Sequence, residues 1–409
     1  MPAPSPHNSL ISVDDALAYL RRHAVPLGVE SVELSQLAGR VAAQDVRAQM
    51  TQPPFCASAM DGYAVKFDDM IKGAKLSVIG EAPAGAPFEG HVKSGQAVRI
   101  FTGGVIPSGA DHVIIQEDVS RDGDIIDVKE DQPMARNIRR AGIDFKKGDR
   151  LIETGDVFGH LSPSVLAAAN IDRASVFKKP VVALFSNGDE LREPGAALKQ
   201  GEIINSNHYG LSALIESWGG EPHYLGCAKD SEDAIEAMFH KGVKADIILP
   251  IGGASVGDYD YVKTAFRVMG GETVFEKIAV RPGKPTWFGT LGAQLVLGLP
   301  GNPASAIVTS RLFLKPLIAQ MAGRRAQDDV YKARLAAPLP TNGARETYMR
   351  ANMERRADAQ LYVRAAPKQD SSLLRPFLKG HVLIKRAPHA PACEADALVE
   401  IIYIGAPQL

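Results

Sequence analysis

The sequence predicts a multidomain fold of class α/β plus β, with a doubly wound α/β domain, an inserted β domain, a small helical or mixed domain and a C-terminal β barrel. The chain has 409 residues, more than one hydrophobic core ordinarily organises. Strand-like and helix-like segments alternate from about residue 180 to residue 323, as in a parallel sheet with helices on both faces. Short β-prone runs dominate two other stretches and predict the β domains.

The composition excludes several function classes. The 46 basic residues nearly cancel the 47 acidic ones, so the chain has no global electrostatic footprint for nucleic acid. Three widely separated cysteines, Cys56, Cys227 and Cys393, form neither a CxxC metal pair nor a disulfide framework. The N-terminus lacks the order of a signal peptide, and no apolar run approaches the roughly 20 residues that cross a bilayer. We therefore expect a cytoplasmic protein that binds neither nucleic acid nor a membrane.

The N-terminal part of the chain predicts helices on either side of a β region. Ser12 is placed to cap a first helix, with Asp15 in the capping-box position. Between residues 46 and 140, short β-prone runs lie between Gly/Pro clusters, which predicts a compact β domain with long loops. Helical spacing then returns, where Ser162 can cap a helix and Pro163 suits its first position.

The α/β stretch opens with a continuous apolar run at residues 180–186, as expected of a parallel strand buried on both faces. Further strands are predicted at 221–228, 245–251, 273–280, 285–291 and 294–301, and helices at 205–219, 230–243, 260–270 and 303–321. Only strand signals follow residue 329, which indicates a small barrel or sandwich. The predicted domains are 8–44 with 141–178, 45–140, 179–327 and 328–409.

Gly-rich and polar loops follow four of the predicted strands. These loops are Asn187–Glu190, Gly252–Asp258, Arg281–Pro285 and Pro300–Pro303. Ligands bind outside the carboxyl ends of the strands in an open parallel sheet, so four such loops would build one pocket. The second loop, with Gly252, Gly253, Ser255 and Gly257, lets backbone N–H groups approach a phosphate. An ordinary tight turn is the alternative for any single loop.

Cationic side chains in the third loop suit an anionic ligand. Lys284 lies between Gly283 and Pro285, and the prolines of this loop leave it few conformations to lose. A lysine presented in this way suits a phosphate or an oxyanion, and Arg281 is near enough in sequence to join it. A solvated loop lysine is the alternative.

Carboxylates accompany these predicted anion sites. Glu190, Asp258 and Asp260 lie in or next to the same loops. Carboxylates near phosphates usually imply a bridging magnesium ion, because the like charges otherwise repel each other. Asp230 is equally suited to be a metal ligand or to cap the following helix, a role for which Ser231 competes.

Two further clusters lie in the β region. Residues 53–64 are rich in small side chains and present Asp61, and residues 137–144 combine basic residues with Asp144. Thr102 lies between the two clusters in a Gly-rich segment. Ordinary turns and solvated side chains remain the alternatives for each cluster taken alone.

Seven motifs, in this order, resemble those of the molybdopterin molybdenumtransferase family, which includes the C-terminal enzyme domain of gephyrin. They are SAMDGYA (58–64), TGGVIPSGAD (102–111), NIRRAGIDF (137–145), LFSNGDEL (184–191), GGASVGDYDY (252–261), RPGKP (281–285) and GLPGNPASA (298–306). The resemblance implies insertion of molybdenum into adenylylated molybdopterin with release of AMP, with molybdate as co-substrate and Mg²⁺ required. It also implies a molybdopterin-binding α/β domain and a homodimer whose active cleft lies between the α/β domain of one subunit and the β domain of the other.

The resemblance assigns roles to particular positions. Catalytic positions of the family fall on Asp61, Asp144, Glu190, Asp230, Asp260 and Lys284. Substrate-binding positions fall on Thr102, Gly252, Gly253, Ser255, Gly257, Arg281, Pro300, Pro303, Arg350 and Ser371.

We hypothesise that Glu190, Asp230 and Asp260 hold magnesium against the pyrophosphate of the substrate, and that residues 252–257 cradle its phosphates. Molybdate is expected at Arg281, Lys284, Arg350 and Ser371. Asp61 and Asp144 are expected to reach the site from the partner subunit.

The chain departs from the family pattern at several positions, among them Asn205, His208 and Arg281. Asn205 replaces an acidic residue of many members, His208 an arginine, and Arg281 a lysine, which keeps the charge but changes its geometry. Two other functions are compatible with parts of the pattern. One is the molybdopterin adenylyltransferase, which shares the GGxS-type signature in a much shorter chain. The other is a non-catalytic scaffold of the gephyrin type.

Overall fold

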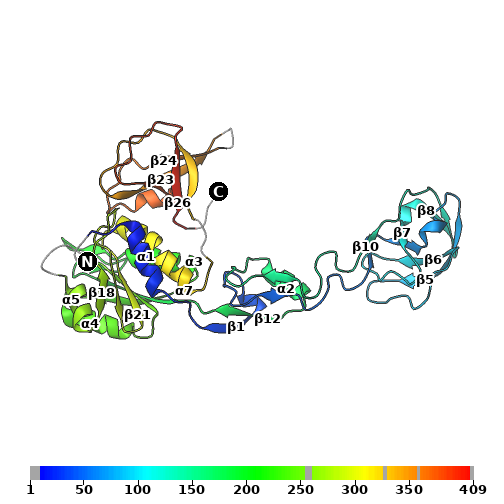
Figure 1. Cartoon of the computed structure of the whole chain (residues 1–409), viewed down its shortest axis with the longest axis horizontal. Coiled ribbons are helices and arrows are strands. Elements are labelled where there is room, and N and C mark those ends of the chain that lie inside the picture. The colour runs from blue at the N-terminus through cyan, green and yellow to red at the C-terminus, as the bar shows by residue number, and fades with distance from the viewer. Residues whose placement is uncertain (1–9, 254–259, 326–328, 357–359, 406–409) are drawn as a thin grey trace, which may run out of the picture.

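The computed structural model describes residues 10–253, 260–325, 329–356 and 360–405. The molecule is elongated, with the α/β part and the C-terminal barrel together at one end and a separate β sheet at the other (Figure 1). A slender middle part lies between them, and one segment of chain leads out to the far sheet while another returns. In the described part of the chain, no helix is long and apolar enough to span a membrane.

The α/β part is built on one mixed sheet with the strand order β16-β13-β17-β21-β20-β18. Its strands are β13 (Val181–Asn187), β16 (Glu221–Ala228), β17 (Ile247–Ile251), β18 (Glu272–Phe275), β20 (Trp287–Leu291) and β21 (Gln294–Gly298). The first four strands in the order run parallel, as predicted. β20 pairs antiparallel with both of its neighbours, β21 and β18, and so runs against the other strands; the prediction of a wholly parallel sheet was therefore wrong. β20 ends at Leu291 and β21 begins at Gln294, and a connection this short permits only a hairpin.

Helices cover both faces of this sheet, which confirms the doubly wound arrangement. α3 (Asn207–Ser217), α6 (Pro303–Thr309) and α7 (Lys315–Met321) pack on one face, and α4 (Glu232–Lys241) and α5 (Tyr261–Val268) pack on the other. The predicted helix 303–321 contains a π-helical turn at Ser310–Leu314. Pro316 follows this turn, and its nitrogen has no N–H to donate to the preceding turn.

The N-terminal helix α1 (Val13–His23) packs on the α/β part. The Ser12 hydroxyl accepts a hydrogen bond from the Asp15 N–H at 3.0 Å, which confirms the predicted N-cap. Ala16 and Leu20 are buried in the same core as the β13, α3 and α7 side chains. The helix therefore lies apart from the slender middle part, with which the sequence grouped residues 8–44.

The middle part joins segments that are far apart in sequence. β1 (Val29–Glu33) pairs antiparallel with β12 (Arg173–Phe177), and β2 (Val46–Arg47) pairs with β11 (Arg150–Ile152). The helix α2 (Ser162–Ala168) has Pro163 in its first turn, as predicted. The predicted Ser162 cap is wrong, because Ser162 is already helical and no side chain caps this helix.

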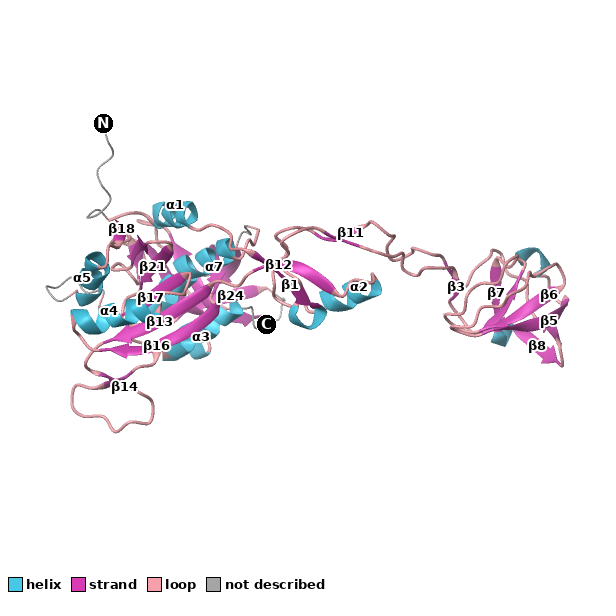
Figure 2. Ribbon diagram, turned by 90° about the horizontal axis from the view of Figure 1, so that it is seen from below, coloured by secondary structure: helices cyan, strands magenta, loops and turns pink. Residues whose placement is uncertain are grey.

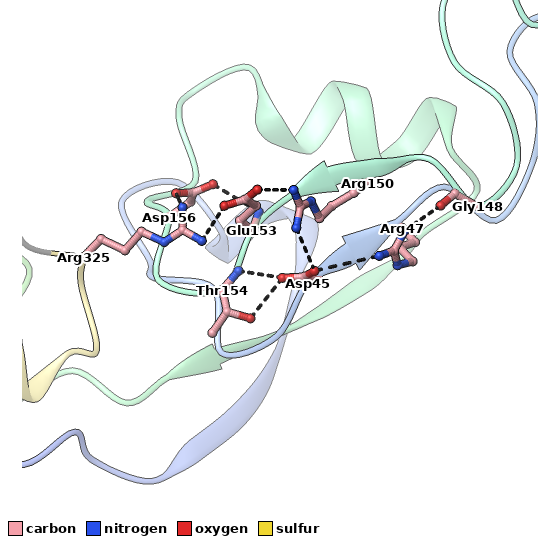
Figure 3. A network of polar contacts seen from close by, with 8 residues as sticks. All are labelled: Asp45, Arg47, Gly148, Arg150, Glu153, Thr154, Asp156 and Arg325. Carbon is pink, nitrogen blue, oxygen red and sulfur yellow. Dashed lines mark hydrogen bonds and ion pairs between the residues drawn. The ribbon is translucent and has the colours of Figure 1, made fainter.

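Ion pairs fasten the middle part to the α/β part (Figure 3). Arg325, just beyond α7, pairs with the Glu153 carboxylate at 2.5 Å and with the Asp156 carboxylate at 3.4 Å. Glu153 also pairs with Arg150, which in turn pairs with Asp45 at 3.5 Å. We call the middle part and the two segments that lead to and from the far sheet the arm. This Arg325 network is one of the links between the arm and the α/β part.

The far sheet has the strand order β7-β4-β6-β5-β9-β8. Its strands are β4 (Gly62–Val65), β5 (Lys75–Ala82), β6 (Gln96–Ile100), β7 (His112–Ile115), β8 (Val119–Asp122) and β9 (Ile125–Val128). A short ladder of β3 (Ala57–Ser58) with β10 (Ile138–Arg139) lies where the chain enters and leaves it. The predicted β character of this inserted stretch is confirmed.

The C-terminal strands close into a barrel, as predicted. Its strands are β22 (Tyr331–Leu335), β23 (Glu346–Arg355), β24 (Leu361–Ala365), β25 (Val382–Arg386) and β26 (Leu398–Tyr403). They follow the order β23-β24-β22-β26-β25, and a β23–β25 pairing completes the circle. The predicted strand 273–280 is in fact divided, because β18 stays in the α/β sheet whereas β19 (Val280–Arg281) pairs with β23.

Candidate active site

A cavity of about 580 Å³ lies at the carboxyl ends of β13, β17 and β21, and we call it the strand-end cavity. Residues from all four predicted loops line it, although only Pro285 comes from the third. Further lining comes from residues 203–207 and from Ser372 of the barrel. The structure therefore brings the predicted loops together at one edge of the sheet and adds a barrel residue to them.

Gly252 and Gly253 form the floor of the strand-end cavity. Their φ angles are +109° and +63°, a region that side-chain-bearing residues rarely adopt. A Cβ on Gly253 would lie 2.5 Å from the Val262 side chain, and one on Gly252 would lie 3.0 Å from the Asn187 carbonyl oxygen. Both positions therefore require glycine. Ser255 and Gly257, which the sequence placed in the same loop, lie outside the described residues, as does Asp258.

The prolines of the fourth loop line the cavity beside the glycines. Pro300 and Pro303 both contribute to its wall, and Pro303 begins α6. Gly301 between them approaches the backbone of Gly252, since a Cβ on Gly301 would lie 3.4 Å from the Gly252 Cα. The second and fourth loops are thus packed against each other through backbone atoms.

The barrel contributes a loop that Arg350 fixes in place. Arg350 is only 1% exposed, and its guanidinium donates to the Asp370 and Leu373 carbonyl oxygens, each at 2.8 Å. The Ser371 carbonyl oxygen accepts from the Ala304 N–H at the start of α6. Ser372, rather than Ser371, lines the cavity. Arg350 is thus placed behind the loop that carries the two serines, and it is not among the residues that line the cavity.

Two of the predicted metal ligands lie close together at the end of β13. Asp230 accepts hydrogen bonds from the Asn187 amide and the Asp189 N–H, both at 3.3 Å. Glu190 lines the cavity and folds over Gly188, since a Cβ there would lie 2.6 Å from the Glu190 carboxylate. The capping role that we left open for Asp230 belongs to Ser231, whose hydroxyl accepts from the Ala234 N–H.

Several carboxylates near Cys227 give the region at the end of β13 a negative electrostatic potential. Partial burial, together with the charges of Glu193, Glu190 and Asp230, raises the pKa of the Cys227 thiol to about 11. A thiol with this pKa remains protonated at neutral pH. Cys227 is therefore a poor nucleophile at neutral pH.

Asp260, the third predicted metal ligand, is already engaged. It caps α5 by accepting from the Lys263 N–H at 3.1 Å, and it pairs with the Lys263 ammonium at 2.9 Å. Both side chains are mostly buried, with 17% and 12% of their surface exposed. In the part of the chain that the structure describes, no group of three His, Cys, Asp or Glu side chains is arranged to hold a metal ion.

The third loop presents Lys284 beside the cavity. Gly283 has a φ of +111°, and a Cβ on it would lie 2.1 Å from the Thr309 methyl group. Thr286 donates to the Gly283 carbonyl oxygen, and the Ile278 N–H donates to the Lys284 carbonyl oxygen. The backbone of this loop is therefore fixed, whereas the Lys284 side chain is exposed. Arg281 is also exposed, next to the barrel strand β23.

The remaining predicted residues lie far from the cavity within one chain. Figure 2 shows the far sheet, which carries Asp61 and Thr102, separated from the α/β part by the whole length of the arm. The Asp61 carboxylate accepts from the Thr102 N–H at 2.7 Å and from its hydroxyl at 2.9 Å, which lowers the pKa of Asp61. Asp144 is exposed on the returning segment, where its N–H donates to the Gln52 carbonyl oxygen.

Two asparagines that the sequence did not single out line the cavity. The Asn187 amide nitrogen donates to Asp230, and that of Asn207 donates to the Gly301 carbonyl oxygen at 2.8 Å. These bonds leave both amide oxygens buried without a hydrogen-bond partner within the described residues. A buried acceptor without a partner costs about 1–3 kcal/mol, which a donor from a bound ligand or water removes. No local signal marks Asn207, although Asn187 begins the first predicted loop.

Three family models together match most of the chain. One described as the MoeA N-terminal region (domain I and II) matches residues 11–170, and one described as a probable molybdopterin binding domain matches residues 183–320. One described as the MoeA C-terminal region (domain IV) matches residues 332–404.

Relatives and solved structures agree with these models over the length of the chain. The molybdopterin molybdenumtransferase of Haemophilus influenzae is 35% identical over 381 residues, which are 92% of this chain and 94% of that protein. That of a Nostoc species is 35% identical over 331 residues, 78% of this chain and 76% of that protein. A crystal structure described as the molybdopterin biosynthesis MoeA protein of Pyrococcus horikoshii has a TM-score of 0.83 at 29% identity and covers 98% of this chain and 100% of that one. On this evidence the chain belongs to the molybdopterin molybdenumtransferase family, whose terminal regions the MoeA models describe.

Proposed function

We propose that this chain is an enzyme that transfers molybdenum to molybdopterin during synthesis of the molybdenum cofactor, and that it acts in the cytoplasm. The observation that carries the proposal is the strand-end cavity, where two backbone-packed glycine loops, two carboxylates and a fixed lysine loop adjoin one another. The enzyme name shared by relatives that match along nearly the whole chain supports the same reaction. It favours this reaction over the upstream adenylyltransferase and over a non-catalytic scaffold.

The phosphates of an adenylylated molybdopterin are proposed to lie on the Gly252 and Gly253 backbone. Positive φ angles and the absence of a Cβ let an anion approach this backbone closely. The Gly252 N–H already donates to the Leu299 carbonyl oxygen, so the Gly253 N–H is the proposed donor. The buried amide oxygens of Asn187 and Asn207 are suited to accept hydrogen bonds from N–H or O–H groups of the same substrate. Pro300 and Pro303 supply a rigid wall on the other side.

The residues at the cavity fit a magnesium ion held by fewer protein ligands than the sequence predicted. Mg²⁺ typically takes one or two carboxylates and completes its shell with water and substrate phosphates. Glu190 and Asp230 provide two carboxylates around the end of β13, and neither forms an ion pair in the described chain. Asp260 is engaged by Lys263, so we propose that it orders the start of α5. When bound, the ion would neutralise charge on the phosphates.

Molybdate is the second substrate in this proposal. Lys284 and Arg281 are the exposed cations nearest in sequence to the cavity-lining Pro285, and they suit its double negative charge. From the barrel side, Ser371 is proposed to offer its hydroxyl, whereas the Ser372 N–H and hydroxyl already donate to the Asp370 carboxylate. Arg350 acts through them as a positioning residue, because its donors already hold the carbonyl oxygens of this loop.

We further propose that a second copy of the chain completes the site. Asp61 and Thr102 lie beside strands β4 and β6 of the far sheet, and Asp144 lies on the returning segment, so none of them lines the cavity of its own chain. The Thr102 N–H and hydroxyl both donate to the Asp61 carboxylate, which fixes its orientation and favours its charged form. In a homodimer, the far sheet of one subunit would present these residues at the strand-end cavity of the other.

The proposal is tested with purified chain, adenylylated molybdopterin, molybdate and Mg²⁺. AMP release is expected to require molybdate, and molybdenum is expected in the product by mass spectrometry. Lys284→Ala should raise the molybdate concentration for half-maximal rate by about tenfold, as expected for loss of a charge-assisted contact. Adenylation of molybdopterin from ATP, without molybdenum insertion, would instead identify the upstream adenylyltransferase.

A further inference from the structure

Arg99 is a half-buried arginine on β6 of the far sheet, outside all seven motifs of the sequence. It pairs with Tyr63 of β4 in the antiparallel ladder, so the two side chains lie on the same face of the sheet. Its guanidinium carbon lies 5.1 Å from the centre of the Tyr63 ring and 4.8 Å from that of the Phe101 ring. Cation–π attraction to both rings therefore restricts where this guanidinium can lie.

The Arg99 guanidinium also forms hydrogen bonds around the turn that carries Asp61. It donates to the Gly62 carbonyl oxygen at 3.0 Å and to the Gln116 side-chain oxygen at 2.8 Å. The Gln116 N–H in turn donates to the Asp61 carbonyl oxygen at 3.1 Å. The backbone carbonyl oxygens of Asp61 and Gly62 are thus both linked to Arg99, the first through Gln116 and the second directly.

The same arginine contacts the segment that carries Thr102. Phe101, whose ring lies near the Arg99 guanidinium, is the residue before Thr102. Thr102 donates from its N–H and from its hydroxyl to Asp61, at 2.7 and 2.9 Å. Arg99 therefore contacts both the segment that carries the carboxylate and the segment that donates to it.

The hydrogen bonds of the Asp61 carboxylate all go to one of its oxygens. The Thr102 N–H and hydroxyl both donate to Oδ1, and Oδ2 receives no hydrogen bond from the described residues. The backbone beside Asp61 is closely packed, since a Cβ on Gly62 would lie 1.8 Å from the Ile114 carbonyl oxygen. Fixing Oδ1 on this backbone leaves Oδ2 as the oxygen that is open to a substrate or an ion.

We propose that Arg99 is a positioning residue for Asp61, which acts by holding the Asp61 turn and the Thr102 segment in place against each other. This inference rests on the proposed function, in which Asp61 completes the site of a second chain. The geometry of Arg99 matters here more than its charge, because a planar guanidinium reaches the Gly62 and Gln116 acceptors at once and a lysine does not. The hydrogen bonds from Thr102 lower the pKa of Asp61 most, and the Arg99 charge adds a smaller effect in the same direction.

Arg99→Lys and Arg99→Gln test this proposal, because lysine keeps the charge without the planar donor group and glutamine removes both. The pKa of Asp61 is measured in the full chain by NMR titration of ¹³C-labelled aspartate carboxylates, with the Asp61 signal identified by its absence in Asp61→Asn. The pKa should rise in both variants, since the Thr102 hydrogen bonds that lower it are loosened. A rise in Arg99→Gln alone would show that Arg99 acts only through its charge and would overturn the proposal.

The rate of molybdenum insertion gives a second readout. Both Arg99 variants should lower kcat at least about tenfold and leave the KM for molybdate unchanged, because Asp61 is displaced while the proposed anion site is not. Arg121→Gln is the matched control, since Arg121 lies on β8 of the same sheet and pairs with Asp124. It should change neither readout. Gln116→Ala is a milder variant if the Arg99 variants unfold, because it removes one acceptor of Arg99 from an exposed position.

The two readouts separate the role of Arg99 from the proposed function. If Asp61→Asn turns over normally, Asp61 is not part of the site and the proposed function fails at this point, whereas the pKa of Asp61 still reports whether Arg99 positions it. The role of Arg99 is overturned if the pKa of Asp61 is unchanged in both Arg99 variants. It is also overturned if their kcat is unchanged while that of Asp61→Asn is lowered.

Discussion

The carboxylates near the strand-end cavity differ in what already engages them. Asp230 accepts two long hydrogen bonds from the end of β13, and Glu190 folds over a glycine. Asp260 instead caps a helix and pairs with Lys263. A carboxylate with a cation at 2.9 Å is a poorer ligand for a second cation. The sequence assigned Glu190, Asp230 and Asp260 the same role in magnesium binding. We now expect substitution of Asp260 to affect the reaction less than substitution of the other two.

Substitution separates these roles. Asp230→Asn should lower the rate of molybdenum insertion at saturating substrate by at least tenfold, because it removes a proposed metal ligand. Asp260→Asn should retain most of the rate, since asparagine caps helices as well as aspartate does. Asp260→Ala should lower the free energy of unfolding by more than the roughly 1 kcal/mol of the lost cap, because it also leaves the mostly buried Lys263 ammonium without its partner. If Asp230→Asn and Asp260→Asn lose the same amount of rate, Asp260 is a metal ligand as the sequence predicted.

The unpaired amide oxygens make a second prediction at this scale. Asn187→Ala and Asn207→Ala should each raise the KM for adenylylated molybdopterin about tenfold, with a smaller change in kcat, because each loses a hydrogen bond to the bound substrate. Asn205→Ala is the comparison, since Asn205 also lines the cavity but its amide oxygen already accepts from the Ser186 hydroxyl. Compared with Asn187→Ala and Asn207→Ala, Asn205→Ala should lower the melting temperature more and raise the KM less. A KM effect confined to Asn205→Ala would reject the assignment.

Individual elements were predictable where their signal is local. The Ser12 cap, the strand-helix alternation and the glycines of the second loop depend on residues close in sequence. The division of β18 from β19 was not predictable, because β19 joins the barrel through its pairing with Glu346 and Thr347. The same holds for the site: Ser372 reaches the cavity only because Arg350 and the start of α6 hold its loop. Such contacts leave no periodicity in the sequence.

A buried histidine makes the far sheet sensitive to acid. His112 on β7 is 0% exposed, and its Nδ1 accepts from the Arg136 N–H. Burial lowers the pKa of His112, the Arg136 charge lowers it further, and Asp111 opposes them weakly. The folded state thus favours neutral His112, so its contribution to stability is complete above the unfolded pKa of about 6.5 and is lost as the pH falls below it.

Thermal unfolding followed at several pH values checks this sign. The melting temperature of the far sheet should fall between pH 7 and pH 5, and the fall should be smaller in His112→Asn, whose amide oxygen can still accept from Arg136. A variant that shows the same pH dependence as the unaltered chain would assign the effect to other groups.

At the scale of the whole molecule, the arm is the feature on which the proposed site depends. Its attachment includes the Arg325 network, which links the end of α7 to the returning segment (Figure 3). Arg325 is half exposed, so solvent screens these ion pairs and they add little to the stability of the fold. They therefore contribute more to the direction of the arm than to global stability.

Arg325→Ala should leave the melting temperature nearly unchanged and speed amide hydrogen exchange in residues 150–156, because the ion pairs that anchor this segment are lost. The control is Arg121→Ala, which removes a surface ion pair with Asp124 within the far sheet. Unchanged exchange at residues 150–156 would show that backbone hydrogen bonds alone anchor this segment, without the ion pairs of Arg325.

The central claim is that one site is assembled from two chains, with the cavity from one and Asp61 from the other. The most direct test mixes two variants with impaired turnover, Asp61→Asn and Asp230→Asn, under conditions that exchange subunits. In a twofold dimer, each mixed pair holds one intact site, so random exchange should restore about a quarter of the full rate of molybdenum insertion. No recovery, despite proven exchange of subunits, would contradict the claim and place both residues in the same chain's site.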